Sequence, residues 1–215
     1  MQNRTVLCFG DSNTHGTIAM ETTTDRRRHA KADRWPSVME AQLGAEWDVV
    51  AEGHPGRTSV FDDPIEGAHK NGLRALLTAL ESHRPIDLVI LMLGTNDLKA
   101  RFSLSANDIA LGIQRLTVDI LRSDTGPDGQ APRVLLAAPV IATETGIFVD
   151  IFAGAAEKSR ALPDKLHNVA AQQHVGFIDL NAVAETDPVD GIHLDAAAQS
   201  AIGLAMARAV SDLMT

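Results

Sequence analysis

The sequence predicts an α/β protein, a three-layer α/β/α sandwich around a five-stranded parallel sheet. Two observations predict it: short apolar runs alternate with longer segments of helical period, and the run Leu88–Leu93 is apolar at every position. A strand buried on both faces reads as such a continuous run, and strands that alternate with helices form parallel sheets covered on both sides. The 215 residues suit a single domain, which we expect to span residues 1–215.

Five strands and five helices are expected in alternation. Ser105 and Asp195 are placed to cap the helices that follow them, because their side chains accept from backbone N–H groups. Pro163 interrupts one helical pattern, so that helix is either kinked or begins later. The expected strands are Thr5–Phe9, Trp47–Ala51, Leu88–Leu93, Val134–Ala138 and Val175–Ile178, and the expected helices are Arg34–Gln42, Asn71–His83, Ser105–Arg122, Gly154–Gln173 and Ala196–Leu213.

The composition excludes several classes of protein. Hydrophobic residues make up 45% of the chain and charged residues 22%, as in ordinary globular domains. A net charge of −9 argues against a nucleic-acid partner, and no apolar run approaches the ~20 residues that cross a bilayer. Met1–Arg4 leads into a strand-like run without a signal peptide's apolar core, so we expect a cytoplasmic protein with no membrane partner. The single cysteine, Cys8, is expected to be a buried small hydrophobic residue.

Ser12 is the candidate nucleophile. It follows the first expected strand within the segment Gly10–Gly16, where a helical turn is expected to begin. Backbone N–H groups at the start of a helical turn are unpaired and favour developing negative charge. Taken by itself, this segment also fits a serine that only caps a helix.

His193 is the candidate general base, and Asp190 is its partner. A histidine acts as a base only when another group, such as a carboxylate, holds its tautomer and orientation. Asp190 precedes His193 by three residues, with Gly191 between them to bend the chain, so the two side chains can meet within one loop. This spacing is common on protein surfaces, and the pair alone does not establish a site.

Two further segments supply donors for an oxyanion hole. Asn96 follows the central expected strand and offers a side-chain amide, and Gly56 follows the second strand and offers a backbone N–H without steric crowding. Each is also an ordinary turn residue. Because ligands bind at the carboxyl ends of the strands in an open α/β sheet, the four segments together predict an acyl-transfer site. The backbone N–H of Ser12 is the third expected oxyanion donor.

The walls of the pocket are expected from three segments without a clear helical or strand pattern: 17–31, 60–70 and 141–151. The basic run Arg26–His29 is interpreted as a solvated loop or a set of ion-pair donors. An apolar cluster of Ile147, Phe148, Ile151 and Phe152 needs a cover, and we expect it to line the acyl pocket. No spacing among the histidines suggests a metal site. The expected substrate-binding residues are Asn13, His15, His54, Ile147, Phe148 and Ile192.

The four blocks resemble those of the SGNH (GDSL-like) hydrolase family, and most of all its bacterial arylesterase/acyltransferase branch. The family name stands for Ser, Gly, Asn and His, which match Ser12, Gly56, Asn96 and His193. The resemblance implies a flavodoxin-like fold, a small-molecule ester substrate and no cofactor or metal. It also implies a homo-oligomer in which the apolar cluster meets another subunit. The blocks are Gly10-Asp11-Ser12, Gly56-Arg57-Thr58, Gly94-Thr95-Asn96-Asp97 and Asp190-Gly191-Ile192-His193.

Two departures from the family pattern leave substrate preference open. Asn13 stands where the name-giving pattern has leucine, and the second block has Gly53 in the neighbourhood where an asparagine is often seen. We expect hydrolysis of short-chain aryl and alkyl esters through an acyl-enzyme, and the branch implies acyl transfer to alcohols or peroxide. The alternatives are a carbohydrate acetyl esterase, a lysophospholipase or a thioesterase on the same scaffold. A non-catalytic binding module is disfavoured by the complete set of site residues.

Overall fold

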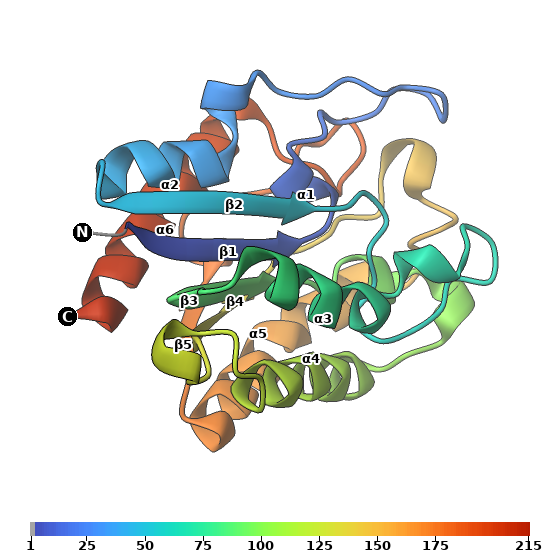
Figure 1. Ribbon diagram of the computed structural model, residues 1–215. Coiled ribbons are helices and arrows are strands. Elements are labelled where there is room, and N and C mark those ends of the chain that lie inside the picture. The colour runs from blue at the N-terminus through green and yellow to red at the C-terminus, as the bar shows by residue number, and fades with distance from the viewer. Residues whose placement is uncertain (1–2) are drawn as a thin grey trace.

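The computed structural model describes residues 3–215 and shows a three-layer α/β/α sandwich (Figure 1). Five parallel strands form one sheet in the order β2-β1-β3-β4-β5, as the sequence predicts for the fold class. β1 lies between β2 and β3, so the direction of winding reverses beside it, which is where doubly wound proteins bind ligands. The strands are β1 (Arg4–Gly10), β2 (Trp47–Gly53), β3 (Leu88–Met92), β4 (Arg133–Ala138) and β5 (Gly176–Asp179).

Helices cover both faces of the sheet (Figure 1). β1 shows why its sequence is apolar throughout: Leu7 and Phe9 pack under α3, α4 and α5, whereas Val6 and Cys8 pack under α2 and α6. Successive side chains of a strand point to opposite faces, so a strand covered on both sides must be apolar at every position. The helices are α1 (Ser12–His15), α2 (Trp35–Leu43), α3 (Gly72–His83), α4 (Ala106–Leu121), α5 (Ala155–Gln173) and α6 (Ala196–Met214).

The expected strands and helices are all present, with ends that differ by no more than two residues. The predicted caps are confirmed: Ser105 Oγ accepts from Asp108 N at 3.2 Å, and Asp195 Oδ1 accepts from Ala198 N at 2.7 Å. A later start for the helix that contains Pro163 is wrong, because α5 is continuous from Ala155. Within residues 3–215, no helix is both long and apolar enough to cross a membrane.

The carboxyl ends of β1, β2 and β3 lie level with one another, because Gly10 pairs with both Gly53 and Met92. α1 and the long loops gather at this edge (Figure 1). Gly53 matters here for a packing reason: a Cβ at this position would collide with the backbone nitrogen of His15. Glycine therefore lets α1 sit over the end of β2, which brings the chain after β1 and the chain after β2 together.

Candidate active site

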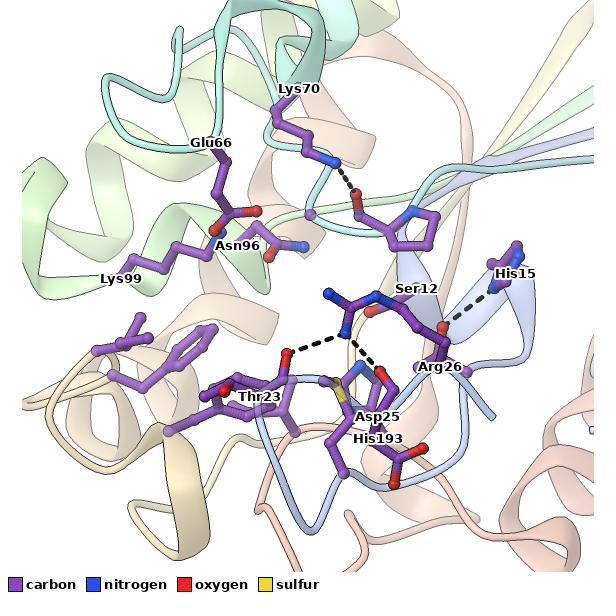
Figure 2. Close-up of a pocket in the computed structure, with 18 of the residues that line it drawn as sticks. Ser12, His15, Thr23, Asp25, Arg26, Glu66, Lys70, Asn96, Lys99 and His193 are labelled. Carbon is purple, nitrogen blue, oxygen red and sulfur yellow. Dashed lines mark hydrogen bonds and ion pairs between the residues drawn. The ribbon is translucent and has the colours of Figure 1, made fainter. Parts of the chain in front are cut away.

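A pocket of about 410 Å³ lies at the carboxyl edge of the sheet. Its lining brings together Ser12, Gly56, Asn96 and His193, which follow β1, β2 and β3 and precede α6 respectively (Figure 2). The three segments expected to form walls all contribute, through residues such as Thr23, Glu66 and Phe148. The fold therefore places the predicted nucleophile, base and oxyanion donors around one space.

Ser12 is the first residue of α1 and is 5% exposed. Asp11 caps the helix by accepting from Asn13 N at 2.9 Å. The N–H of the first helical residue has no acceptor inside the helix, so the Ser12 N–H is available to a ligand beside its own hydroxyl. Burial raises the pKa of Asp11, against the opposing influence of Asn13 and His193.

Asp190 holds His193 in one orientation. His193 Nδ1 lies 2.6 Å from Asp190 Oδ2, and the two side chains are 6% and 0% exposed. Because Nδ1 faces a carboxylate, it carries the proton and Nε2 is left as the basic nitrogen. Asp190 also accepts backbone N–H groups from Ile192 at 3.0 Å, from His193 at 2.9 Å and from Met20 at 2.7 Å. The carboxylate is thus fixed by the backbone of two loops.

The same contacts keep Asp190 ionised. Burial alone would raise the pKa of Asp190, but the hydrogen bonds from the His193 ring and from the backbone outweigh burial and hold that pKa below its usual range. An ionised Asp190 can stabilise the cationic imidazole that forms when His193 takes a proton.

Asn96 and Gly56 present donors to the pocket. Asn96 is 6% exposed, and its Nδ2 has no hydrogen-bond partner within the described chain. Buried amide donors are nearly always paired, so an unpaired one in a pocket wall marks a place for an arriving acceptor. Gly56 has a φ of +81°, and a Cβ there would lie 2.7 Å from Glu66 Oε2. The turn therefore favours glycine for its backbone conformation rather than for close packing, because the Glu66 carboxylate is the end of a flexible side chain that could move.

Asn13 is one of the expected substrate-binding residues, but its side chain makes other contacts in the structure. It does not line the pocket; its Nδ2 donates to Ile192 O at 3.0 Å across 179 residues of sequence. Gln199 Nε2 donates to Asn13 O at 3.0 Å. Asn13 therefore ties α1 to the loop of His193 and to α6, which holds the two ends of the chain together beneath the pocket.

His54 and Ile147 also lie outside the pocket lining, whereas His15, Phe148 and Ile192 belong to it. The His54 ring packs against the ring of His69, with 5.7 Å between centroids, and its Nε2 lies 3.4 Å from Lys70 Nζ. Ile147 precedes Phe148 in the short turn Gly146–Phe148, where only Phe148 turns into the pocket. Whether His54 and Ile147 line the pocket depends on the direction of their side chains, which the neighbouring sequence does not predict.

Sequence reasoning missed Arg57, which joins the ends of β1 and β2 beside Gly56. Its guanidinium donates to Gly10 O at 2.9 Å and to Glu52 O, and lies 4.1 Å from the centre of the Phe9 ring. Burial lowers the pKa of Arg57 to about 10. The only available signal was its place directly after Gly56, because a buried arginine cannot be distinguished from an exposed one by sequence pattern.

Asp97 supports the turn that carries Asn96. It is fully buried and accepts from Ser59 N at 3.0 Å and from Ser59 Oγ at 2.5 Å. These bonds connect the chain after β3 to the loop after Gly56. Burial raises the pKa of Asp97 to about 6, although the Ser59 hydrogen bonds oppose this.

The sequence profile of the GDSL-like Lipase/Acylhydrolase family matches residues 8–201. The chain belongs to this family. Membership confirms the resemblance seen in the four sequence blocks and the expected enzyme class, a hydrolase of carboxylic esters with small-molecule ester substrates. No curated protein matches the chain.

Two solved structures are similar to this GDSL-like hydrolase over almost all of its length. The native aryl esterase of M. smegmatis is 39% identical, with a TM-score of 0.92, and the match covers 98% of this chain and 99% of that one. Est24, a carbohydrate acetylesterase from Sinorhizobium meliloti, is 38% identical, with a TM-score of 0.94, covering 98% of this chain and 100% of that one. Both agree with the fold and with an esterase.

Proposed function

We propose that this GDSL-like hydrolase is a serine esterase that cleaves short-chain aryl and alkyl esters, with Ser12 as nucleophile. One observation carries the proposal: a single pocket is lined by Ser12, by the imidazole that Asp190 orients and by the unpaired amide of Asn96 (Figure 2). The similarity to an aryl esterase favours aryl esters among the possible substrates.

The proposed reaction begins when Ser12 Oγ attacks the ester carbonyl and His193 Nε2 takes the hydroxyl proton. The oxyanion of the tetrahedral intermediate accepts from the backbone N–H of Ser12, the backbone N–H of Gly56 and Asn96 Nδ2. His193 then donates the proton to the departing alcohol. The acyl group stays bound to Ser12 as the acyl-enzyme. Water then attacks this group with His193 as base, and collapse of the second intermediate releases the carboxylic acid and restores Ser12.

The size and lining of the pocket support short substrates. About 410 Å³ lies near the lower end of the range for small-molecule sites. Phe148, Ile151 and Phe152 give it an apolar wall that suits an aryl or short alkyl group. The similarity to Est24 favours acetylated carbohydrates as the second candidate substrates. Rates on acetyl, butyryl and octanoyl aryl esters and on acetylated sugars separate these candidates from a lysophospholipase or thioesterase.

Labelling with a fluorophosphonate and turnover of p-nitrophenyl acetate test the proposed nucleophile. The wild type is expected to be labelled and active, and Ser12→Ala is expected to be neither. Ser200→Ala, an exposed serine on α6, is the matched control and is expected to behave as wild type. A purified, folded Ser12→Ala protein that still hydrolyses the ester would overturn the proposal.

Acyl transfer to alcohols or peroxide belongs to the same proposal, because either can attack the acyl-enzyme in place of water. Product analysis with an added alcohol measures it. A single domain over residues 1–215, a homo-oligomer, a cytoplasmic location and independence of cofactors and metals stay predictions. Light scattering of the purified chain tests the homo-oligomer, which a monomer at all concentrations would refute.

A further inference from the structure

The pocket wall carries charges that the proposed mechanism does not use. Basic side chains outnumber acidic ones there, although the whole chain has a net charge of −9. A local excess of cations in an acidic protein needs a reason, because positive charges lining a cleft attract anions. Apart from the histidines, the basic lining residues are Arg26, Arg27, Lys70 and Lys99, and the acidic ones are Asp25 and Glu66. Figure 2 labels all of these except Arg27.

Two of the four cations already have carboxylate partners. Arg27 Nη2 lies 2.6 Å from Asp25 Oδ2. Lys99 Nζ lies 2.5 Å from Glu66 Oε1 and 3.3 Å from the buried Asp63 Oδ2. Pairing at these distances largely cancels the charge that each group offers to a ligand. The excess positive charge therefore comes from the other two.

Arg26 and Lys70 make no ion pair with any carboxylate among residues 3–215. Lys70 Nζ donates to Pro55 O at 2.8 Å. Arg26 Nη1 donates to two backbone oxygens, Thr23 O at 2.9 Å and Asp25 O at 2.6 Å. Figure 2 shows the Arg26 guanidinium extending from its loop over the pocket. Carbonyl oxygens orient a guanidinium but leave its full charge uncompensated.

The unused edge of Arg26 has a particular shape. Both backbone contacts involve Nη1, so the Nε and Nη2 groups have no hydrogen-bond partner in the described part of the chain. These two groups form the fork that binds a carboxylate through two parallel hydrogen bonds. The fork of this exposed guanidinium is therefore free to bind a ligand, while two carbonyl oxygens hold its Nη1 group.

The loop that carries Arg26 is fixed at both ends. Ile18 N donates to Arg27 O at 3.2 Å, and Met20 N donates to Asp190 Oδ2 at 2.7 Å, the same carboxylate oxygen that His193 contacts. A cation held in place before binding costs less entropy when a ligand arrives than one on a free loop.

From these contacts we infer that the natural substrate is an ester that carries a carboxylate, which the open fork of Arg26 binds with Lys70 as the second cation. The inference rests on the proposed esterase function and names the substrate class. The apolar wall of Phe148, Ile151 and Phe152 would hold the uncharged part of the same molecule. A purely neutral ester would gain nothing from the Arg26 charge, which solvent hydrates in the free protein.

Two matched esters test the inference: 4-acetoxybenzoate and its uncharged methyl ester. Each kcat/KM is divided by the rate of hydrolysis by hydroxide, which corrects for the difference in leaving group. The corrected wild-type preference for the anion is expected to be about five- to tenfold, as for a charge-assisted hydrogen bond weakened by solvent. Arg26→Gln is expected to remove most of it, and Arg26→Lys, which keeps the charge but not the fork, to retain part.

Arg208→Gln is the control for net charge, because Arg208 is an exposed arginine on α6 outside the pocket lining. It is expected to keep the wild-type preference. Salt at about 1 M, where the screening length is about 3 Å, is expected to reduce the preference in the wild type. An equal preference in wild type and Arg26→Gln, or no preference in wild type, would overturn the inference.

A binding measurement keeps this inference separate from the proposed function. Benzoate titrated into the Ser12→Ala protein by calorimetry is expected to bind, and to bind about five- to tenfold more weakly when Arg26→Gln is added. Arg26-dependent benzoate binding in a chain that hydrolyses neither ester would contradict the esterase proposal and support the carboxylate site. Ester hydrolysis by Ser12 without any Arg26-dependent binding of benzoate would support the esterase proposal and contradict the carboxylate site.

Discussion

Replacing Asn96 with alanine is expected to separate activity from stability. Asn96 Nδ2 is buried in the pocket wall and has no partner in the described chain, so it is free to donate to an acceptor that the substrate brings. In the proposed mechanism, that acceptor is the oxyanion of the tetrahedral intermediate. Loss of one oxyanion donor typically lowers kcat about 100- to 1,000-fold, which corresponds to about 3–4 kcal/mol.

The same substitution removes no hydrogen bond that Asn96 donates within the folded chain. A buried amide without a partner costs about 1–3 kcal/mol, and alanine removes that cost. The deleted atoms face the pocket, so no closed cavity forms behind them. The free energy of unfolding is therefore expected to stay unchanged or to rise by about 1 kcal/mol.

Asn71 is the matched control, because it is also 6% exposed but fully bonded. It caps α3 by accepting from Leu73 N at 2.9 Å, and its Nδ2 donates to Val60 O at 2.9 Å and to Asp62 Oδ1 at 2.7 Å. Loss of the cap and of these bonds is expected to lower the free energy of unfolding by about 2–3 kcal/mol. Asn71 does not line the pocket, so Asn71→Ala should change kcat little.

Saturation kinetics on p-nitrophenyl acetate and urea unfolding measure the two effects, with the stability comparison made at constant m-value. The two variants are expected to differ in opposite ways. Asn96→Ala loses kcat and keeps its free energy of unfolding, whereas Asn71→Ala keeps kcat and loses free energy of unfolding. If Asn96→Ala kept kcat within about tenfold of wild type, the oxyanion assignment would fail. Equal losses of stability in both variants would show that the Asn96 side chain has a partner in solution.

Three further predictions concern residues around the site. Burial raises the pKa of Asp97 to about 6, so between about pH 4 and pH 6 the folded chain keeps a proton that the unfolded chain has lost. The free energy of unfolding should therefore fall as pH rises through this interval, by up to about 3 kcal/mol, and urea unfolding of Asp97→Asn should show a flatter profile. Asp63→Ala leaves the buried Lys99 with a weaker set of partners, and urea unfolding is expected to show a loss of about 3–5 kcal/mol. Gly191 has a φ of +71°, and a Cβ there would collide with Thr143 O, so Gly191→Ala should displace the loop of the base and lower kcat about 100-fold with far-UV circular dichroism unchanged.

Local parts of the site could be predicted because their members lie close together in the sequence. Asp190 and His193 are three residues apart with a glycine between them, and the structure joins them at 2.6 Å. The helix caps at Ser105 and Asp195 were predictable for the same reason, since a cap involves only the next three residues. The apolar runs located the strands because burial on both faces leaves no polar position.

Side-chain direction was not predictable in the same way. Arg26 and Arg27 are adjacent and identical, yet Arg27 pairs with Asp25 while Arg26 extends over the pocket. Asn13 lies next to the nucleophile but turns beneath the pocket to Ile192 O. Each outcome depends on which distant segment packs against the residue, and that information is absent from its neighbours in sequence.

The order and spacing of residues by themselves determined that this chain forms alternating strands and helices, and which four segments supply a serine, two donors and a histidine with its carboxylate. They did so because periodicity and short-range turns act over a few residues. The tertiary structure alone decided which side chains of these segments turn into the common pocket, and that the cation Arg26 extends over it. The physical reason is the reversal of winding beside β1, which brings the ends of three strands level and lets loops far apart in the chain meet.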